Sequence, residues 1–335
     1  MTLTESPPTQ PDAAPPRHRL IKRLFLGLLA LGVVVVFLAV GFVLWTDSKI
    51  DRLDQEALPS LTPIAGETRT ILVVGTDDRS SIPADFDDTF GAFEGSRTDT
   101  IILVNFTPGE GAQMLSIPRD LMVDIPGKDT NRINAAFVFG GPELLIATIS
   151  SNLGIEVNHY VEIDLGGFAK LVDAIGGVNF LFEHAARDAK SGLDVSAGLH
   201  RLDGEEALAY VRSRQYEELQ DGEWVTVRGS DIGRTERQQQ MLLTLFDQVA
   251  SKQNALNLPR FAATFAGEVT VDAGMGLGVI IEIGRAAIDM STGDITAKTL
   301  PVVDFRGSDG RAYVIPSDEA EPYLAAFRAT ETLPE

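Results

Sequence analysis

The sequence predicts one α/β domain, built in α/β/α layers around a mixed β-sheet and preceded by a single transmembrane helix. From residue 70 onward, short β-branched runs alternate with segments of helical periodicity, a pattern typical of a sheet covered by helices. The chain has 335 residues, and no internal repeat or strong boundary divides the part after residue 68, which favours one domain. A long apolar run near the N-terminus predicts the membrane helix.

Three apolar, β-branched runs predict the first strands of the sheet. They cover Thr70–Gly75, Thr100–Phe106 and Gln113–Ile117. The first is followed by aspartates, the second by Pro108 and Gly109, and the third by Pro118. These residue types commonly end strands, so polar loops are expected directly after the strands.

Helices and strands are predicted to alternate through the rest of the domain. Helices are expected at 141–152, 167–175, 203–211, 231–249, near 277–290 and near 318–329, and strands at 160–164, 178–182 and near 295–300. Pro142 suits a first helical turn, and the acidic residues that follow Asp203 favour the positive end of a helix dipole. This order predicts helices on both faces of a mixed sheet.

The apolar run from Leu24 to Trp45 predicts a membrane-spanning helix. It contains about 22 residues and no charge, close to the ~20 that a helix needs to cross a bilayer. Basic residues cluster just before it, at positions 17–23. The positive-inside rule places that end in the cytoplasm, so the remaining chain is expected outside the cytoplasm, anchored to the cell membrane by a single pass.

A cleaved signal peptide is the alternative interpretation of this run. Its apolar part would span only ~7–15 residues and end at a small-x-small site, but the single candidate triplet, Ala39–Gly41, lies inside the run. An uncleaved anchor is therefore favoured. The predicted parts are a cytoplasmic tail at 1–23, the transmembrane helix at 24–45, a stalk at 46–67 and the main domain at 68–335.

Composition argues against several classes of function. The formal net charge is −20, whereas nucleic-acid binding usually requires basic surface stripes. There is no cysteine, which excludes thiol catalysis and thiolate metal sites and leaves stability to the core. Four histidines without an HExxH spacing do not predict a zinc site. No GxxxxGK[ST] loop is present, so chemistry of the ATPase type is not expected.

Aspartates lie where the first two predicted strands would meet. Asp77 follows the first strand, and Asp99 directly precedes the second. If these strands are neighbours, the two carboxylates share one edge of the sheet. Two carboxylates, completed by water and phosphate oxygens, are a usual way to hold Mg²⁺. The alternative is that these aspartates only cap turns and strand ends.

Arginines gather at the same kind of position. Arg97, Arg119, Arg212, Arg214 and Arg234 all fall at predicted strand ends or helix starts, where α/β sheets place ligand sites. In an extended segment, Arg212 and Arg214 would share one face and would require an anion or flanking carboxylates. Taken singly, an arginine such as Arg119 is explained by a surface salt bridge. Together with two carboxylates, the set suits a pyrophosphate–Mg²⁺ complex.

The start of the helix at 231–249 orders another group of polar side chains. Asp231, Arg234 and Gln238 are spaced i, i+3 and i+7, which places them on one helix face. Arg237 lies about a quarter of a turn off that line. Asp231 can cap the helix and hold Arg234 in one rotamer. A solvated charged face is the alternative.

These motifs, in this order, resemble the LytR-CpsA-Psr family over about residues 70–249. The matching stretches are Val-Val-Gly-Thr-Asp-Asp-Arg79, Ser-Arg97-Thr-Asp99-Thr, Leu-Ser-Ile-Pro-Arg119-Asp, Arg132-Ile-Asn-Ala-Ala-Phe, Gly-Gly-Pro-Glu143-Leu, Tyr160-Val-Glu-Ile-Asp, Leu-Val-Asp-Ala-Ile-Gly-Gly177, Tyr-Val-Arg212-Ser-Arg214 and Asp231-Ile-Gly-Arg234-Thr-Glu-Arg237-Gln238-Gln. Arg132 stands where the family commonly has lysine, so positive charge is kept there.

The resemblance implies a bacterial cell-wall transferase with Mg²⁺ or Mn²⁺ as cofactor. Such enzymes move a glycan phosphate from a polyprenyl-pyrophosphate carrier onto peptidoglycan or a related wall polymer, and wall teichoic acid and arabinogalactan are among the polymers concerned. By matching motifs, the resemblance implies that Asp77 and Asp99 bind the metal, that Arg97, Arg119, Arg132, Arg212, Arg214, Arg234 and Gln238 bind the pyrophosphate, and that Arg97, Asp99, Arg119 and Asp231 are catalytic.

Two other functions stay open at this point. One is a polyprenyl-pyrophosphate binding or regulatory protein without turnover, and the other is a Mg²⁺-dependent lipid pyrophosphatase that uses water as acceptor. The expected partners are the lipid-linked glycan, a wall-polymer acceptor and the membrane, and no nucleic acid.

Overall fold

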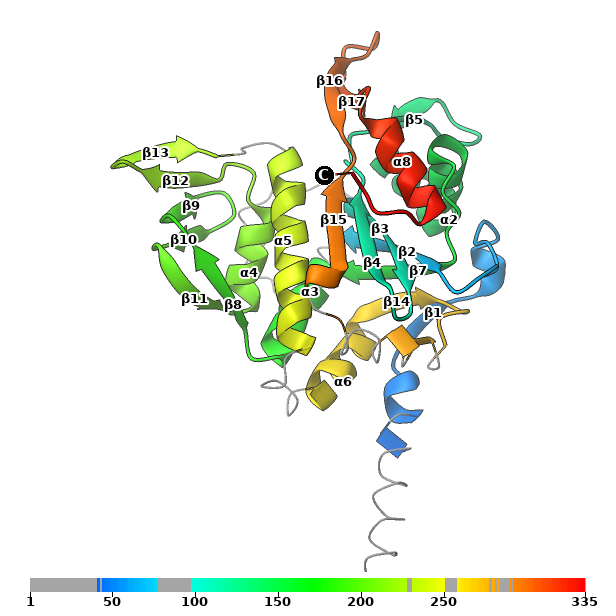
Figure 1. Ribbon diagram of the computed structural model, residues 1–335, viewed down its shortest axis with the longest axis horizontal. Coiled ribbons are helices and arrows are strands. Elements are labelled where there is room, and N and C mark those ends of the chain that lie inside the picture. Colours follow the sequence, from blue (N-terminus) through cyan, green and yellow to red (C-terminus); the bar gives the residue numbers. More distant parts are fainter. Residues whose placement is uncertain are drawn as a thin grey trace, which may run out of the picture. The chain divides into compact units, whose positions relative to one another are not determined.

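The computed structural model describes residues 41–42, 44–77, 98–227, 231–250, 258–276, 279–280, 282–283, 290 and 292–334 (Figure 1). The chain divides into two compact units, residues 1–48 and 49–335. In the first unit, residues 44–47 are helical. The second unit contains a seven-stranded sheet and the candidate site.

The main sheet is mixed, as the sequence predicts. Its order is β1 (Asp51–Leu53), β14 (Val269–Asp272), β7 (His159–Asp164), β2 (Arg69–Thr76), β3 (Thr98–Thr107), β4 (Gly111–Ser116) and β15 (Ile295–Thr299). The pairs β1–β14, β2–β7 and β4–β15 are parallel, and the remaining neighbours are antiparallel. The three strands predicted first therefore lie side by side at its centre.

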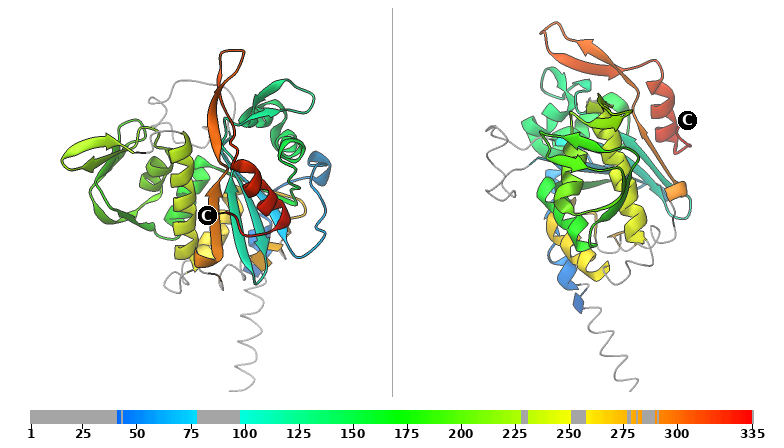
Figure 2. Two further views of the ribbon diagram at one scale, coloured as in Figure 1. Left: turned by 45° about the horizontal axis from the view of Figure 1, so that its top comes forward. Right: turned by 90° about the vertical axis from the view of Figure 1, so that its left-hand side faces the viewer.

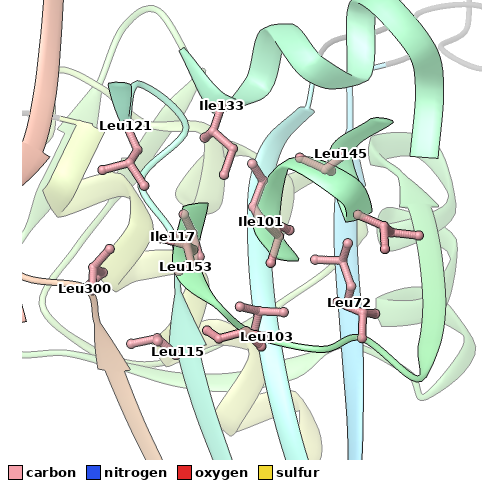
Figure 3. Packing of buried hydrophobic residues seen from close by; sticks show 14 of the residues in the cluster. Leu72, Ile101, Leu103, Leu115, Ile117, Leu121, Ile133, Leu145, Leu153 and Leu300 are labelled. Carbon is pink, nitrogen blue, oxygen red and sulfur yellow. The ribbon is translucent and has the colours of Figure 1, made fainter. Parts of the chain in front are cut away.

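Both faces of the sheet are covered, because apolar side chains alternate between two cores. Leu72 and Val74 of β2 pack in the larger core, and Ile71 and Val73 of the same strand in a smaller one. The larger core involves α2 (Ile133–Leu153) and α8 (Ala320–Ala329), and the opposite side of the sheet holds α3 (Leu165–Ala174), α5 (Asp231–Ala250) and α6 (Leu258–Glu268) (Figures 1 and 2). Figure 3 shows the larger core, with Leu72, Leu103 and Leu115 from three adjacent strands beneath Leu145 and Leu153 of α2.

Smaller elements surround the main sheet. A four-stranded sheet has the order β10 (Leu193–Val195), β9 (Ala186–Asp188), β12 (Glu217–Gln220) and β13 (Glu223–Thr226), and the two-stranded pairs are β8 (Val178–Phe182) with β11 (Gly198–Leu202), β5 (Met122–Asp124) with β6 (Thr130–Arg132), and β16 (Val302–Arg306) with β17 (Ala312–Pro316). Helix α4 (Gly204–Arg212) lies between β11 and β12 in the chain.

Local caps explain where two of the helices start. The Asp164 carboxylate accepts a hydrogen bond from the Gly167 amide at 2.6 Å, which caps α3. Asp203 and Glu206 form a capping box at the start of α4, so two otherwise unpaired amides gain partners. The acidic first turn predicted for this helix is therefore part of its cap.

Helix α2 begins earlier than the sequence predicts. The expected start at Gly141 corresponds to a kink, since Gly140 and Gly141 have non-helical dihedral angles and Gly141 has φ of 64°. A first helical segment from Ile133 precedes this kink. The helix predicted near 277–290 falls mostly outside the described residues.

The segment expected to form a stalk belongs largely to the domain. Strand β1 pairs with β14 at the edge of the sheet, and Leu58 is 2 % exposed within the larger core. The second unit accordingly starts at Lys49 rather than at residue 68. The sequence prediction was wrong here because the short run Asp51–Leu53 carries no β-branched residue.

The predicted membrane span at 24–45 lies almost entirely outside the described residues. Within the described ranges, one helix, α2, is long and apolar enough to cross a bilayer. Its buried residues, including Leu145 and Ile149, pack in the larger core, and it is kinked. Packing against the sheet thus accounts for the apolar residues of its buried face, whereas Val138 and Phe139 before the kink are exposed.

Candidate active site

Asp99 lies at the centre of the candidate site. It sits in a β-bulge of β3, because Thr98 pairs with Thr76 while Thr100 pairs with Gly75 of the neighbouring strand. A bulge re-aims a side chain relative to the regular sheet. The Asp99 side chain is 21 % exposed, so it is largely removed from water but open on one side.

Three guanidinium groups converge on this carboxylate. Arg119 forms an ion pair with Oδ1 of Asp99. Oδ2 lies 3.2 Å from Nη2 of Arg214 and 3.8 Å from Nη1 of Arg234. Burial raises the pKa of Asp99, but the guanidinium groups of Arg234, Arg119 and Arg214 outweigh it and hold this pKa below its usual value.

Each of these arginines is supplied by a different element. Arg119 follows β4 in a tight turn in which the Leu121 amide donates to the Pro118 carbonyl at 3.0 Å. Arg214 lies just beyond α4 and keeps 52 % of its side chain exposed. Arg234 is near the start of α5 and is buried. Residues far apart in the sequence, predicted at element ends, are thus brought together.

Asp120 extends the cluster to a fourth arginine. Its carboxylate lies 3.5 Å from Nε of Arg119 and 3.1 Å from Nε of Arg132. Arg132 also donates hydrogen bonds to the Ala312 carbonyl of β17 and lies 5.9 Å from the ring centre of Tyr313. Among the described residues, the ion pairs thus join four arginines to Asp99 and Asp120, and guanidinium groups gathered in this way suit an anion with several charges.

Arg212 and Gln238 belong to α4 and α5, two helices that contact each other in the fold. Arg212 is the last residue of α4, and Nε2 of Gln238 is 3.5 Å from the Val211 carbonyl oxygen. The expectation that Arg212 and Arg214 share one face of an extended segment was therefore wrong. The helix, stabilised by its capping box, continues as far as Arg212, and the chain leaves it at Ser213.

Two predicted site residues cannot be placed in this geometry. Arg97 lies outside the described residues, and so does the side chain of Asp231, although Asp231 is the first residue of α5. Their assignments remain predictions.

Asp77 is the second carboxylate predicted for a metal ion. It directly follows Thr76, whose pairing with Thr98 brings it beside the Asp99 bulge. Its Oδ1 is buried and has no hydrogen-bond partner among the described residues. A buried carboxylate oxygen without a hydrogen-bond partner at this strand end suits Mg²⁺, which takes one or two protein carboxylates and fills its other positions with water and phosphate. Among the described residues there is no cluster of three or more His, Asp or Glu side chains that would make a fully protein-built metal cage.

The structure adds two residues that the sequence did not single out for the site. Asp188 of β9 accepts hydrogen bonds from the segment that carries Arg214, and Arg237 of α5 donates one to the Ser213 carbonyl. The helical periodicity predicts only that Arg237 lies off the face shared by Asp231 and Arg234. In the sequence, the signal that could have indicated Asp188 as a partner is the polar Ser213 between two arginines, since its hydroxyl donates to Asp188.

Comparison with known proteins identifies the family. The model of the LytR_cpsA_psr family matches residues 45–326. The chain belongs to this family. The resemblance found in the motifs is thereby confirmed, and the match extends beyond residues 70–249 at both ends.

Members of this family include curated relatives of moderate similarity. The probable cell wall biosynthesis protein LcpB of Corynebacterium glutamicum is 34% identical over 308 residues, which cover 90% of this chain and 70% of that protein. The regulatory protein MsrR of Staphylococcus aureus is 34% identical over 215 residues, 62% of this chain and 60% of MsrR. The polyisoprenyl-teichoic acid–peptidoglycan teichoic acid transferase TagU of Halalkalibacterium halodurans is 38% identical over 184 residues, 54% of this chain and 53% of TagU.

Solved structures of LytR_cpsA_psr proteins share the fold. A LytR-Csp2A-Psr enzyme from Actinomyces oris superposes with a TM-score of 0.65 at 31% identity, over 84% of this chain and 96% of that one. TagV of Bacillus subtilis gives a TM-score of 0.62 at 24% identity, over 80% and 96%. The mixed sheet with helices on its two sides is thus the fold of the family.

Proposed function

We propose that this protein is a cell-wall phosphotransferase that moves a glycan phosphate from a polyprenyl-pyrophosphate carrier onto peptidoglycan or a related wall polymer. The observation that carries the proposal is the convergence of Arg119, Arg214 and Arg234 on one carboxylate at the start of strand β3. Family membership supports it, and the name of TagU describes such a transfer. The specific polymer is left open.

In this reaction the arginines bind the pyrophosphate and neutralise its charge. Arg234 is buried and so offers a fixed contact, whereas the half-exposed Arg214 meets the ligand as it enters. The acceptor hydroxyl attacks the phosphorus that carries the glycan, the bond from this phosphorus to the bridging oxygen breaks, and polyprenyl phosphate leaves. Phosphoryl transfer depends mainly on positioning and charge neutralisation, which the cluster provides.

A divalent cation, Mg²⁺ or Mn²⁺, belongs to the proposal. Asp77 and Asp99 would hold it, and it would neutralise phosphate charge when bound. The orphaned oxygen of Asp77 supports this assignment. Arg97 and Asp231 are proposed as further catalytic residues, and Arg132, Arg212 and Gln238 as further contacts of the pyrophosphate, on the matching motifs.

We place the protein in the bacterial cell membrane, with the helix at 24–45 as anchor and the domain outside the cytoplasm. The apolar run and the basic cluster before it support this topology.

The test is a reconstituted transfer reaction. Full-length protein in detergent, with Mg²⁺, a lipid-linked glycan pyrophosphate and peptidoglycan, should release polyprenyl phosphate and label the peptidoglycan. The matched controls omit peptidoglycan or replace Mg²⁺ with EDTA. Equal release without peptidoglycan would instead identify a lipid pyrophosphatase.

A binding or regulatory role is the second candidate, favoured by the name of the relative MsrR. It predicts tight binding of the lipid-linked glycan and no product with any wall acceptor. Binding and turnover measured on the same preparation separate the two functions.

A further inference from the structure

The segment that carries Arg214 is held by a carboxylate from another part of the fold. Asp188, the last residue of β9, is 2 % exposed. Its Oδ2 accepts hydrogen bonds from Oγ of Ser213 at 2.7 Å, from the amide of Arg214 at 2.9 Å and from the amide of Gln215 at 2.8 Å. Its Oδ1 accepts from the Lys190 amide at 2.9 Å. Both oxygens are therefore engaged, one by the segment that carries Arg214 and the other by the turn that follows β9.

Arg237 holds the same segment through the Ser213 carbonyl and the Tyr216 ring. Its Nη2 donates to the Ser213 carbonyl, and its guanidinium lies 4.8 Å from the centre of the Tyr216 ring. Arg237 is 5 % exposed and belongs to α5, the helix that also carries Arg234. Ser213 is thus linked through its hydroxyl to Asp188 of β9 and through its carbonyl to α5, the helix that carries Arg234.

This arrangement matters because the Arg214 side chain is itself weakly constrained. With 52 % of it exposed, its surface ion pair alone contributes little to order. A long side chain is preorganised only if its backbone is fixed, and preorganised charge binds an anion without first being ordered. The three donors on one oxygen of Asp188 fix that backbone directly before and after the Cα atom of Arg214.

We infer that Asp188 is a positioning residue of the candidate site, which fixes residues 213–215 so that Arg214 points toward Asp99 and the anion bound there. Arg237 completes the brace through the Ser213 carbonyl. Asp188 touches no ligand and acts through Arg214. The inference rests on the proposed function for the identity of the anion, a prenyl pyrophosphate, but not for the backbone role.

The experiment uses the full-length protein and the Asp188→Asn variant, which keeps the size of the side chain and removes its charge. Hydrogen exchange of the Arg214 and Gln215 amides should become at least about ten-fold faster, because these amides lose a charged acceptor. Binding of farnesyl pyrophosphate with Mg²⁺ should weaken about five- to ten-fold, within the usual range for coupling between sites. Asp221→Asn, an exposed carboxylate in the β12–β13 turn, is the matched control and should change neither quantity.

A double-mutant cycle separates positioning from a general loss of structure. In an Arg214→Ala background, Asp188→Asn should not weaken farnesyl pyrophosphate binding further. An equal loss in both backgrounds, or unchanged amide exchange, overturns the inference. If amide exchange accelerates but the unmodified protein does not bind farnesyl pyrophosphate, the proposed function fails and the backbone role stands. Should Asp188→Asn not fold, Ser213→Ala removes one of the three donors and should act in the same direction with smaller changes.

Discussion

Replacing Asp99 with asparagine separates two roles of the site arginines. They stabilise the fold by pairing with the Asp99 carboxylate, and they bind an anionic ligand. The substitution keeps the shape of the side chain but leaves Arg119, Arg214 and Arg234 without the carboxylate that they share. Breaking a buried ion pair costs about 3–5 kcal/mol. Because Asp99 is 21 % and Arg214 52 % exposed, solvent screening reduces this to about 2 kcal/mol, or a Tm lower by about 4–8 °C.

The same variant should bind anions better when no metal is present. Asp99 no longer competes with phosphate oxygens for the guanidinium groups, so inorganic pyrophosphate should raise the Tm of Asp99→Asn more than that of the wild type in EDTA. A ligand at a hundred times its Kd adds about 2.7 kcal/mol of stability, which would fully offset the loss. Transfer activity with Mg²⁺ should nevertheless fall, since one proposed metal ligand is gone.

The assay is a thermal melt across a pyrophosphate titration, with calorimetric titration as a second measure of affinity. Asp304→Asn on β16 makes the same charge change at an exposed position and serves as control. Two results would contradict these expectations: a Tm of Asp99→Asn equal to that of the control variant, or weaker binding of pyrophosphate to Asp99→Asn than to the wild type in EDTA.

Three further predictions test other parts of the structure. Arg132→Ala removes the contacts to Asp120 and the Ala312 carbonyl, so proteolysis of the β16–β17 hairpin should be faster, with at most about 1 kcal/mol lost from the free energy of unfolding; an unchanged cleavage rate contradicts this. Asp203→Ala removes the cap of α4 and should cost about 1 kcal/mol in chemical denaturation, whereas Asp203→Asn should cost less. Hydrogen bonds outweigh burial and hold the pKa of Asp188 below its usual value, so its stabilisation is present above the unfolded pKa of ~3.9 and is lost as the pH falls through the folded pKa. The difference in urea stability between wild type and Asp188→Asn should therefore stay constant from about pH 7 to 5 and shrink below about pH 4.

The central strands and the meeting of acidic and basic residues could be predicted from the sequence. Strands β2 and β3 carry β-branched apolar runs, β4 contains Met114 and Leu115, and turn-forming residues follow all three, so their existence follows from residue type. The antiparallel pairing of β2 with β3 makes the two strands neighbours, with Thr76, directly before Asp77, opposite Thr98, directly before Asp99. The convergence of Arg119, Arg214 and Arg234 follows from their positions at element ends.

The rest depended on interactions that leave no pattern in the sequence. Two of the three hydrogen bonds to Oδ2 of Asp188 come from backbone amides, which every residue except proline possesses. Strand β1 is recognisable only by its partner β14, because its three residues carry no β-branched signature. The Arg-Ser-Arg spacing suggested an extended backbone at Arg212. Instead, α4 continues as far as Arg212, because its capping box stabilises the helix.

The closure of the larger core by the end of the chain limits how the protein can be shortened. Every predicted site residue lies before the end of α5, yet β14, β15 and α8 all follow it. Phe327 of α8 is 1 % exposed, and its carbonyl accepts a hydrogen bond from Nδ2 of Asn105 in β3 at 2.6 Å. A fragment cut after α5 would retain all the predicted binding motifs but expose the apolar side chains beneath α8, at about 1.5–3 kcal/mol for a residue such as Phe327. Such a fragment should aggregate, so any expression boundary has to lie beyond α8.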